Sequence, residues 1–453
     1  MITGLLAKLP QFFQKIPAWL LFGLLVALSA TGYGWLGYDT PRTNFLQLIA
    51  LFGVLFALYG LVLVWPWSRR YLHAWVGAAV GFRLLLLWAI PNLSDDYARF
   101  VWDGRLLAHG FNPYLYLPTS LLNSPVLVQA GLTKELFDGL NSPQYFTVYP
   151  PLNQAFFGLA AWFSGQNVWL NIVCLRSFIL VAELGTCWLL YAPKYPRRVL
   201  IYALNPLVII ELTGNLHFEG IVIFFVLLAF RWLQTRPILS AVALVLAVGT
   251  KLLPLLFLPL IVSQLGWRRA VVYCATLGVG TGLLFWPFLS TELFQNMGKS
   301  LDLYFQKFEF NGSLYYVARA AGFWYKGYNV IQTLGPALSL LAGLGIVWIG
   351  FSKWAGFGQN FQGLMCRALL SLLVYFLAAT TVHPWYITTL VALCGFTVFR
   401  FPVVWSVLLP LTYAAYAAVP FRENGWFLLL EYATLLLFVA LEVSYLSKAT
   451  WTK

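Results

Sequence analysis

Two neighbouring carboxylates, Asp95 and Asp96, are the residues of this chain best suited to acid–base chemistry. They follow an apolar run and open an amphipathic stretch that extends to Gly104. Only 15 of the 453 residues are acidic. Charged groups at a membrane boundary are costly to hold and usually serve a function. The pair therefore predicts either a reactive carboxylate or, as the simpler alternative, the acidic first turn of a helix.

Sugar transfer needs only one carboxylate when the donor carries phosphate, whereas sugar hydrolysis needs two. Phosphate leaves without being protonated, so a nearby cation replaces the acid. One Asp then takes the proton from the acceptor hydroxyl. The pattern predicts one essential carboxylate, Asp95 or Asp96, together with scattered basic groups. The candidates for those groups are Arg99, Arg105, Lys251, Arg319 and His383.

The stretch after Ser94 has the spacing of a helix. Ser94 is a suitable N-cap, and carboxylates in the first turn favour the helix dipole. Asp96, Arg99 and Asp103 share one face by i, i+3 and i+7 spacing, and apolar side chains line another. We expect a helix that lies flat at the membrane interface, with this polar face toward the external solvent, and that ends at Gly110.

Other polar side chains lie at the ends of apolar segments, on the same predicted side as the Asp pair. Asn215, His217 and Glu219 follow one segment, and His383 and Tyr386 precede another. They could contact a substrate. A lone His is more often structural, however, and aromatic residues at such positions also form the interfacial belt of membrane proteins. Both interpretations are open at this point.

Three further charges lie within apolar segments. Lys251 separates two short segments, 237–250 and 253–265, which predicts a hairpin or a broken helix there. An embedded Lys is usually paired, so we expect a phosphate or carboxylate partner, with extension toward the interface as the alternative. Arg176 and Glu183 lie two turns apart in one segment, and we expect them to pair with each other.

The composition is that of an integral membrane protein. Hydrophobic residues make up 61% of the chain, aromatic residues 18% and charged residues 9%, whereas a soluble domain has about 25% charged residues. The net charge of +13 does not indicate a nucleic-acid partner. The basic residues lie at alternate ends of the apolar runs, which is the positive-inside pattern. The charge therefore reports the orientation of the spans, and the expected partners of these residues are anionic membrane lipids.

We expect an all-α, polytopic transmembrane bundle of about 12–14 spans, forming one integral-membrane domain over residues 1–453. Both termini then lie in the cytoplasm. The first apolar run continues past Ala30, so it is expected to be a retained span and not a cleaved signal peptide. The expected spans are 17–37, 43–66, 72–92, 167–192, 198–213, 216–233, 237–250, 253–265, 270–289, 331–352, 366–382, 386–399, 402–420 and 426–447.

Two long regions lie outside the membrane in this arrangement. They are 93–166, which contains the Asp pair, and 291–330. Long loops are uncommon unless they are functional. Segments 151–164 and 312–325 are too short to span a bilayer, so we expect interfacial or re-entrant helices there.

The five cysteines all fall in apolar runs and have no metal-ligand spacing, so we expect small buried hydrophobic side chains. The sequence has no phosphate-binding loop, dinucleotide fingerprint or metal-ligand cluster. We therefore expect no cofactor and do not favour a bound divalent metal.

A series of motifs resembles those of C-type (GT-C) integral-membrane glycosyltransferases. The likeness is strongest to bacterial polyprenol-phosphate-mannose-dependent mannosyltransferases, and more distant to the mannosyltransferase of glycosylphosphatidylinositol synthesis. It covers residues 70–400. The motifs are Asp95-Asp-Tyr-Ala-Arg-Phe-Val-Trp-Asp-Gly-Arg-Leu-Leu-Ala-His-Gly-Phe-Asn-Pro-Tyr114, Val148-Tyr-Pro-Pro-Leu152, Asn205-Pro-Leu, Gly214-Asn-Leu-His217, Lys251-Leu-Leu-Pro254, Phe310-Asn-Gly312 and His383-Pro-Trp-Tyr386.

The resemblance implies a transferase with its site at the external face. The donor would be a polyprenyl-phosphate-linked sugar, with mannose favoured, and the acceptor a lipid or glycan hydroxyl. The Asp directly before Tyr in the distant relative corresponds to Asp96, which is preferred over Asp95 as the base. Ser94 stands where that relative has a further Asp, which argues against a metal. Residues expected to bind the donor phosphate or substrate are Arg99, Asp103, Arg105, Asn112, Tyr114, Tyr149, Asn215, His217, Lys251, His383 and Tyr386.

Two other functions are compatible with this sequence. A transporter or flippase of polyprenyl-linked sugars would share the bundle and the embedded charges, although transporters often show internal repeats, which are absent here. A non-catalytic receptor or scaffold would tolerate isosteric changes at the Asp pair. The location expected for the transferase is the bacterial cytoplasmic membrane, with the site facing outward and both termini in the cytoplasm.

Overall fold

A computed structural model describes residues 17–64, 70–306, 308–352 and 358–451. The predicted all-α class is confirmed over these residues. They form helices and turns, with one isolated β-bridge between Phe310 and Thr381. Two of the basic residues in the positive-inside pattern, Lys8 and Lys15 before the first apolar run, lie outside the described residues.

Seven helices among the described residues are long and apolar enough to cross a membrane. Their lengths match the roughly 20 residues that a bilayer core requires, and the polytopic bundle is confirmed. They are α2 (Ala18–Tyr38), α3 (Phe45–Val64), α10 (Val168–Leu190), α16 (Trp267–Phe285) with the short η4 (Trp286–Phe288), α19 (Ile331–Phe351), α20 (Phe361–Ala378) and α24 (Gly425–Trp451).

The other expected spans coincide with shorter apolar helices. The predicted break at Lys251 is confirmed, because α14 ends at Thr250 and Lys251 has an extended backbone. The shorter helices are α4 (Leu72–Leu86), α14 (Pro237–Thr250), η3 (Leu253–Phe257) with α15 (Leu258–Leu265), η6 (Pro384–Ile387) with α21 (Thr388–Cys394), and α22 (Phe401–Leu408) with η7 (Leu409–Tyr413) and α23 (Ala414–Ala417).

One helix pair is sharply bent. After α11 (Arg197–Ala203), the helices α12 (Pro206–Val208) and η2 (Ile209–Gly214) run to a break, and α13 (Glu219–Trp232) leaves it at an angle of 112°. The segment η2 is a π-helix, a form that is often found at functional sites. Leu216 within the break has a φ of 63°, which is unusual for a residue with a branched side chain.

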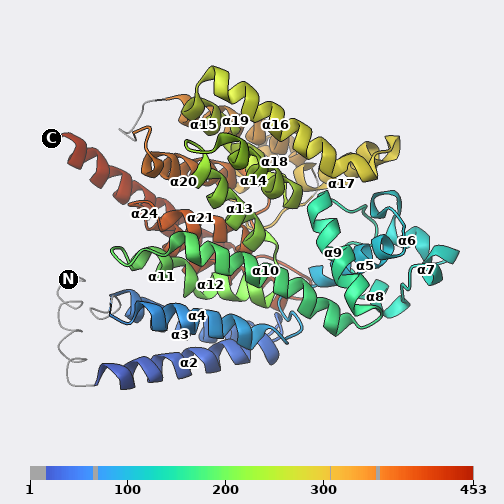
Figure 1. The fold of residues 1–453 in the computed structure, drawn as a ribbon, viewed down its shortest axis with the longest axis horizontal. Coiled ribbons are helices and arrows are strands. Elements are labelled where there is room, and N and C mark those ends of the chain that lie inside the picture. The colour runs from blue at the N-terminus through green and yellow to red at the C-terminus, as the bar shows by residue number, and fades with distance from the viewer. Residues whose placement is uncertain (1–16, 65–69, 307, 353–357, 452–453) are drawn as a thin grey trace.

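A group of short helices covers one end of the bundle, as Figure 1 shows for α5–α8. We call this the α5 end. The spanning helix α2 begins and α24 ends at the opposite end (Figure 1). The short helices are α5 (Asp96–Ala108), η1 (Pro113–Leu115), α6 (Pro118–Leu121), α7 (Pro125–Gln129), α8 (Lys134–Asp138) and α9 (Pro151–Ser164), and the second long loop forms α17 (Thr291–Gln306) and α18 (Leu314–Lys326).

Helix α5 does not present its polar face to solvent, so that prediction is wrong. Arg99, Asp103 and Arg105 are all buried. Gly104 explains the close packing, since a Cβ there would lie 2.3 Å from the carbonyl oxygen of Phe157 on α9. The covering helices α6–α9 bury the middle of α5 and leave its first turn and its C-terminal residues Leu107 and Ala108 partly open.

The predicted Arg176–Glu183 pair is also wrong. Glu183 instead accepts hydrogen bonds from Arg83 of α4 at 2.8 and 2.9 Å, and from Thr213. Arg176 donates to the carbonyl oxygens of Leu87, Thr213 and Gly214 at the helix break. Arg176 and Glu183 each bond to residues outside α10 and not to each other, although their spacing along α10 had suggested a pair.

The expectation of buried cysteines holds for three of the five. Cys187, Cys366 and Cys394 are buried, whereas Cys174 is partly exposed and Cys274 is exposed on α16. The surface of α16 is largely apolar, as expected for a helix that contacts lipid.

Candidate functional site

The two carboxylates lie at the start of α5 but do not cap it. The side chain of Asp95, the N-cap residue, accepts no hydrogen bond from the first turn. Ser94 Oγ instead accepts from the backbone N–H of Asp96 at 3.3 Å. Both carboxylates point to residues distant in sequence, so the alternative in which they serve only as helix caps is not supported.

Asp95 forms an ion pair with a residue that sequence reasoning missed. Its Oδ2 lies 2.5 Å from Nη2 of Arg42, and the two side chains are 41% and 31% exposed. Arg42 lies in the short α2–α3 connection, and its guanidinium stacks over the ring of Tyr416 at 4.8 Å. The Arg42 guanidinium is held by the Tyr416 ring and the Asp95 carboxylate. The Arg42 side chain is still partly accessible to solvent or substrate.

Asp96 has different partners. Its Oδ1 accepts a hydrogen bond from Nδ2 of Asn141 at 2.7 Å. Its Oδ2 lies 4.0 Å from Nε2 of His217, and its side chain is 23% exposed. The distance to His217 is too long for a direct hydrogen bond. A proton donor such as a hydroxyl group could fit between these two atoms.

His217 is held rigidly by the bent helix pair. Its Nδ1 lies 2.8 Å from the carbonyl oxygen of Glu211 and 3.3 Å from Glu211 Oε2. Glu211 also accepts hydrogen bonds from Tyr413 at 2.6 Å and from Asn215 at 3.2 Å. The opposite nitrogen, Nε2, is buried and has no hydrogen-bond partner among the described residues. That nitrogen faces Asp96.

A row of stacked rings extends from His217 toward the second long loop. His217 stacks on Trp385 with ring centroids 3.7 Å apart, and Trp385 stacks on His383 at 4.3 Å. His383 in turn stacks on Phe310 at 5.0 Å. This row fixes the orientation of both imidazoles and closes one side of the site with aromatic surface.

Lys251 has the carboxylate partner that was expected. Its Nζ pairs with Glu219 at the start of α13 and lies 5.7 Å from the ring centroid of Tyr386. The Lys251 side chain is 25% exposed. Burial, together with the nearby His217 and Lys251, lowers the pKa of His383 to about 3. His383 is therefore neutral at physiological pH, and Lys251 is the better cation of the two.

The sequence matches the model of a protein family described as "Alpha-(1->6)-mannopyranosyltransferase, N-terminal domain" over residues 20–266, which is more than half of the chain. The chain belongs to this family. The matched region includes Asp95, Asp96, His217 and Lys251, and it ends before His383. The mannosyltransferase resemblance predicted from the motifs is confirmed.

One relative of this mannosyltransferase-family chain is the Alpha-(1->6)-mannopyranosyltransferase A of Corynebacterium glutamicum. The two are 24% identical over 198 residues, which cover 42% of this chain and 38% of the relative. The aligned part therefore spans less than half of that protein. No solved structure matches the chain.

The family motifs divide into residues at the site and residues that brace it. Asp96, Asn215, His217 and His383 are linked by the contacts described above, and Asp95 and Lys251 lie at the site in ion pairs with Arg42 and Glu219. The other motif residues predicted to bind substrate brace the structure through partners within the protein. Arg99 pairs with Asp103 at 2.9 Å, and Arg105 donates to the carbonyl oxygens of Gly131 and Gln166.

The Asn-Pro-Tyr motif joins α5 to the second long loop. Asn112 donates to the carbonyl oxygen of Phe288, and Asn296 donates to that of Tyr114. The Tyr114 hydroxyl donates to the carbonyl oxygen of Tyr149 at 2.6 Å. Arg319, a predicted cation, pairs instead with Glu309.

Arg42, Glu211 and Tyr416 were missed because each lies outside the motifs. Trp385 lies within the His383-Pro-Trp-Tyr386 motif, but only its neighbours His383 and Tyr386 were predicted as site residues. The Gly214-Asn-Leu-His217 motif could have pointed to Glu211, since an acidic residue in an apolar span usually has a function.

Proposed function

We propose that this protein transfers a mannosyl unit from a polyprenyl-phosphate-linked donor to a hydroxyl group of an acceptor, with Asp96 as the general base. Family membership supports mannosyl transfer. The observation that carries the base assignment is the position of Asp96. Its carboxylate is partly exposed and faces an unpartnered imidazole nitrogen 4.0 Å away.

The transfer is a single displacement with inversion at the anomeric carbon. Asp96 takes the proton of the acceptor hydroxyl, and the acceptor oxygen forms a bond to the anomeric carbon of the donor sugar. The bond from that carbon to the phosphate oxygen breaks, and the polyprenyl phosphate leaves with the electron pair. A base within hydrogen-bond reach accelerates such a step by about 10²–10⁴-fold.

The two carboxylates have separate roles in this mechanism. Asp95 is paired with Arg42, so it positions a cation and is less free to accept a proton. Arg42 and Lys251 are the cations for the departing phosphate, where negative charge develops in the transition state. His383, being neutral, contributes only a hydrogen bond or a packing surface.

The α5 end faces the outside of the cell in this proposal. Basic residues mark the other ends of the spans, and Arg197 begins helix α11, which lies far from α5 in Figure 1. An apolar polyprenyl tail would lie against the lipid-facing helices and bring its phosphate to the cluster at the α5 end.

The substitution Asp96→Asn tests the base. It keeps the size of the side chain and its contact with Asn141 but removes the basic oxygen. We expect turnover of polyprenyl-phosphate mannose to fall by about 10²–10⁴-fold, with an unchanged melting temperature and unchanged donor binding. Asp138→Asn, an exposed Asp in the same long loop, is the matched control and is expected to keep wild-type turnover. Wild-type turnover in Asp96→Asn would end the assignment.

Transport of a polyprenyl-linked sugar is the second candidate function, and the 112° break between η2 and α13 favours it. Broken helices line the substrate sites of many transporters. A product assay in detergent separates the two, because no compartments exist there. Formation of a mannosylated product supports transfer, whereas flipping in vesicles without product supports transport.

A further inference from the structure

Helix α18 in the second long loop carries an exposed apolar face. Leu314, Val317, Ala321 and Trp324 follow one another at i, i+3, i+7 and i+10, so they lie on one side of the helix. All four are exposed, Val317 to 71% and Trp324 to 89%. A row of exposed apolar side chains of this kind indicates an interaction surface.

The opposite side of α18 is bound to the protein. Tyr315 and Arg319 both donate hydrogen bonds to Glu309. A Cβ at Gly322 would lie 2.4 Å from a side-chain carbon of Val330, directly before α19, so the two segments pack closely there. These contacts fix the rotation of α18 and direct its apolar face away from the bundle.

The place of α18 in the chain puts it at a membrane interface. The helix has 13 residues, too few to span a bilayer, and it ends at Lys326. The spanning helix α19 begins at Ile331, five residues later, a stretch that reaches at most about 18 Å. Trp324, Tyr325 and Tyr328 are exposed next to this point, and these residue types are enriched at membrane–water interfaces.

The chemistry of the face favours lipid over a protein or glycan partner. Its four side chains carry a single polar atom, the indole nitrogen of Trp324, whereas protein interfaces are usually rich in hydrogen bonds. Helix α18 has no acidic residue, and its last residue, Lys326, suits the phosphate groups of lipids. The helix also packs against the start of α19, whose exposed side chains, such as Leu340 and Leu344, are those of a spanning helix.

The segment 308–313 joins α18 to the candidate site. Phe310 in this segment stacks on His383 at the end of the aromatic row. Its backbone N–H donates to the carbonyl oxygen of Thr380 at 3.1 Å, and its carbonyl oxygen accepts from Val382 at 2.8 Å. Because α18 begins directly after the segment, the position of the helix affects the contact between Phe310 and His383.

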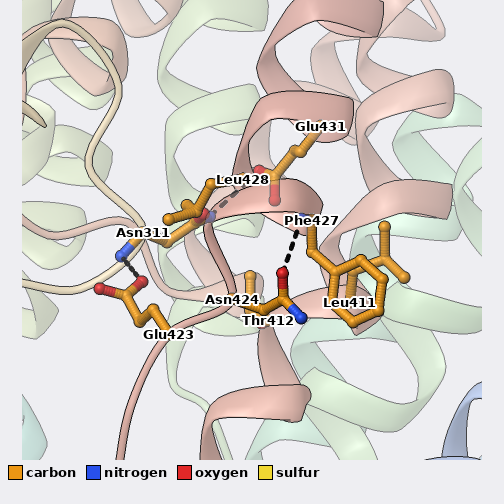
Figure 2. A pocket seen from close by; sticks show the side chains of 8 residues that line it. All are labelled: Asn311, Leu411, Thr412, Glu423, Asn424, Phe427, Leu428 and Glu431. Carbon is orange, nitrogen blue, oxygen red and sulfur yellow. Dashed lines mark hydrogen bonds between the residues drawn. The ribbon is translucent and has the colours of Figure 1, made fainter. Parts of the chain in front are cut away.

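Glu423, just before α24, ties α18 and this segment together. It accepts a hydrogen bond from the backbone N–H of Asn311 at 2.6 Å, which Figure 2 shows, and another from the hydroxyl group of Tyr316. Tyr316 belongs to α18, and Asn311 lies three residues before the helix begins. Displacement of α18 would therefore strain both bonds.

We propose that the apolar face of α18 contacts lipid at the membrane interface, and that this contact holds Phe310 against His383. The lipid surface is then a partner of the candidate site, because it fixes the segment that ends the aromatic row. The inference goes beyond the proposed function and does not depend on it, since a transporter would need the same contact.

Spin labels test the lipid contact. The two accessible cysteines, Cys174 and Cys274, are replaced by Ser, and a nitroxide is attached at Val317→Cys or Trp324→Cys in lipid nanodiscs. Lys134→Cys on α8 is the matched control, because Lys134 is charged and exposed. We expect oxygen, which concentrates in lipid, to relax the two α18 labels more strongly than a water-soluble nickel chelate does. The reverse is expected at position 134.

Two results of the labelling experiment would overturn the inference. Stronger relaxation by the nickel chelate at both α18 positions would mean that the face lies in water. Weak relaxation by both reagents would mean that protein covers it, as in contact with a second copy of the chain.

Hydrogen exchange in nanodiscs tests the link from the lipid contact to the site. The double variant Val317→Ser/Trp324→Ser makes the face polar without changing the opposite side of α18. We expect the backbone amides of Phe310 and Asn311 to exchange about tenfold faster than in the wild type, the scale of one weakened apolar contact. Val317→Leu/Trp324→Phe keeps the face apolar and should exchange at the wild-type rate.

The amides of α5 are the internal control for this measurement. Unchanged exchange in 308–313 of the serine variant would overturn the link, and so would an equal increase in α5, because the whole protein would then be loosened. Neither experiment requires turnover, so both results stand whether or not Asp96→Asn keeps its activity.

Discussion

Two carboxylates in this molecule, Glu183 and Asp96, differ in how completely they are paired. Within the bundle, Glu183 accepts two hydrogen bonds from Arg83, and Arg83 also donates to the carbonyl oxygens of Ala79 and Ala203. At the α5 end, Asp96 has one direct hydrogen bond and a 4.0 Å gap to His217. The first group is almost fully buried, and the second is partly open.

The difference separates a structural charge from a reactive one. A buried ion pair must be fully hydrogen-bonded to offset its desolvation. A base must instead keep one oxygen available and lie where the substrate can reach it. Incomplete pairing together with partial exposure distinguishes Asp96 from Glu183, which is fully buried and hydrogen-bonded through both oxygens.

Glu183→Ala should have the largest effect on stability. It leaves Arg83 buried without its carboxylate, which costs about 3–5 kcal/mol. We expect poor yield and a clearly lowered melting temperature in detergent, measured by tryptophan fluorescence. Asp96→Asn should leave the same transition unchanged. Similar melting temperatures for Glu183→Ala and Asp96→Asn would contradict the distinction between a structural carboxylate at Glu183 and a reactive one at Asp96.

Arg42→Gln should have the next largest effect, on turnover and not on folding. Removing one preorganised cation from a developing negative charge costs about 10²–10³-fold in rate. Asp95→Asn should act in the same direction but less strongly, because it only loosens Arg42. The measurement is single-turnover transfer from polyprenyl-phosphate mannose. An Asp95→Asn defect as large as that of Asp96→Asn would instead make Asp95 the base.

Much of this arrangement could be predicted from the sequence. Apolar length marked the spans, and the rarity of acidic residues marked Asp95 and Asp96. The break at Lys251 was predicted where that charge separates two short apolar segments, whereas the bent helix pair around Leu216 was predicted only as two separate spans, 198–213 and 216–233. Each of these features depends on residues that are close together in the sequence, and residue spacing and composition predict features of this kind.

The pairing of the charges could not be predicted in the same way. Spacing along one helix suggested Arg176 with Glu183 and an exposed face for Arg99 and Asp103. Both expectations failed because a neighbouring helix, or the cover of α6–α9, provided closer partners. The same reason hid Arg42, since its ion pair with Asp95 joins two connections that are distant in the chain.

His217→Gln should cause a smaller defect than Arg42→Gln. The amide can keep a hydrogen bond to Glu211 but does not place a ring nitrogen opposite Asp96. Hydrogen bonds to charged groups are worth about 1.5–3 kcal/mol, which corresponds to about a tenfold to hundredfold loss of kcat. The test is single-turnover transfer. An unchanged rate in His217→Gln would mean that His217 only packs against Trp385.

Asn141→Ala should have the smallest effect of these variants. It tests directly whether the single hydrogen bond to Asp96 contributes little, in contrast to the full pairing of Glu183. Asn141 is exposed and donates to Oδ1 of Asp96 at 2.7 Å, so its loss removes one ordinary hydrogen bond, worth about 0.5–1.5 kcal/mol. We expect kcat to fall about threefold to tenfold with little change in the donor KM. Asn141→Asp should be worse, because a second carboxylate beside Asp96 repels it. If Asn141→Ala instead matches Asp96→Asn in severity, then Asp96 is held by its partners as tightly as Glu183, and incomplete pairing is not what makes it reactive.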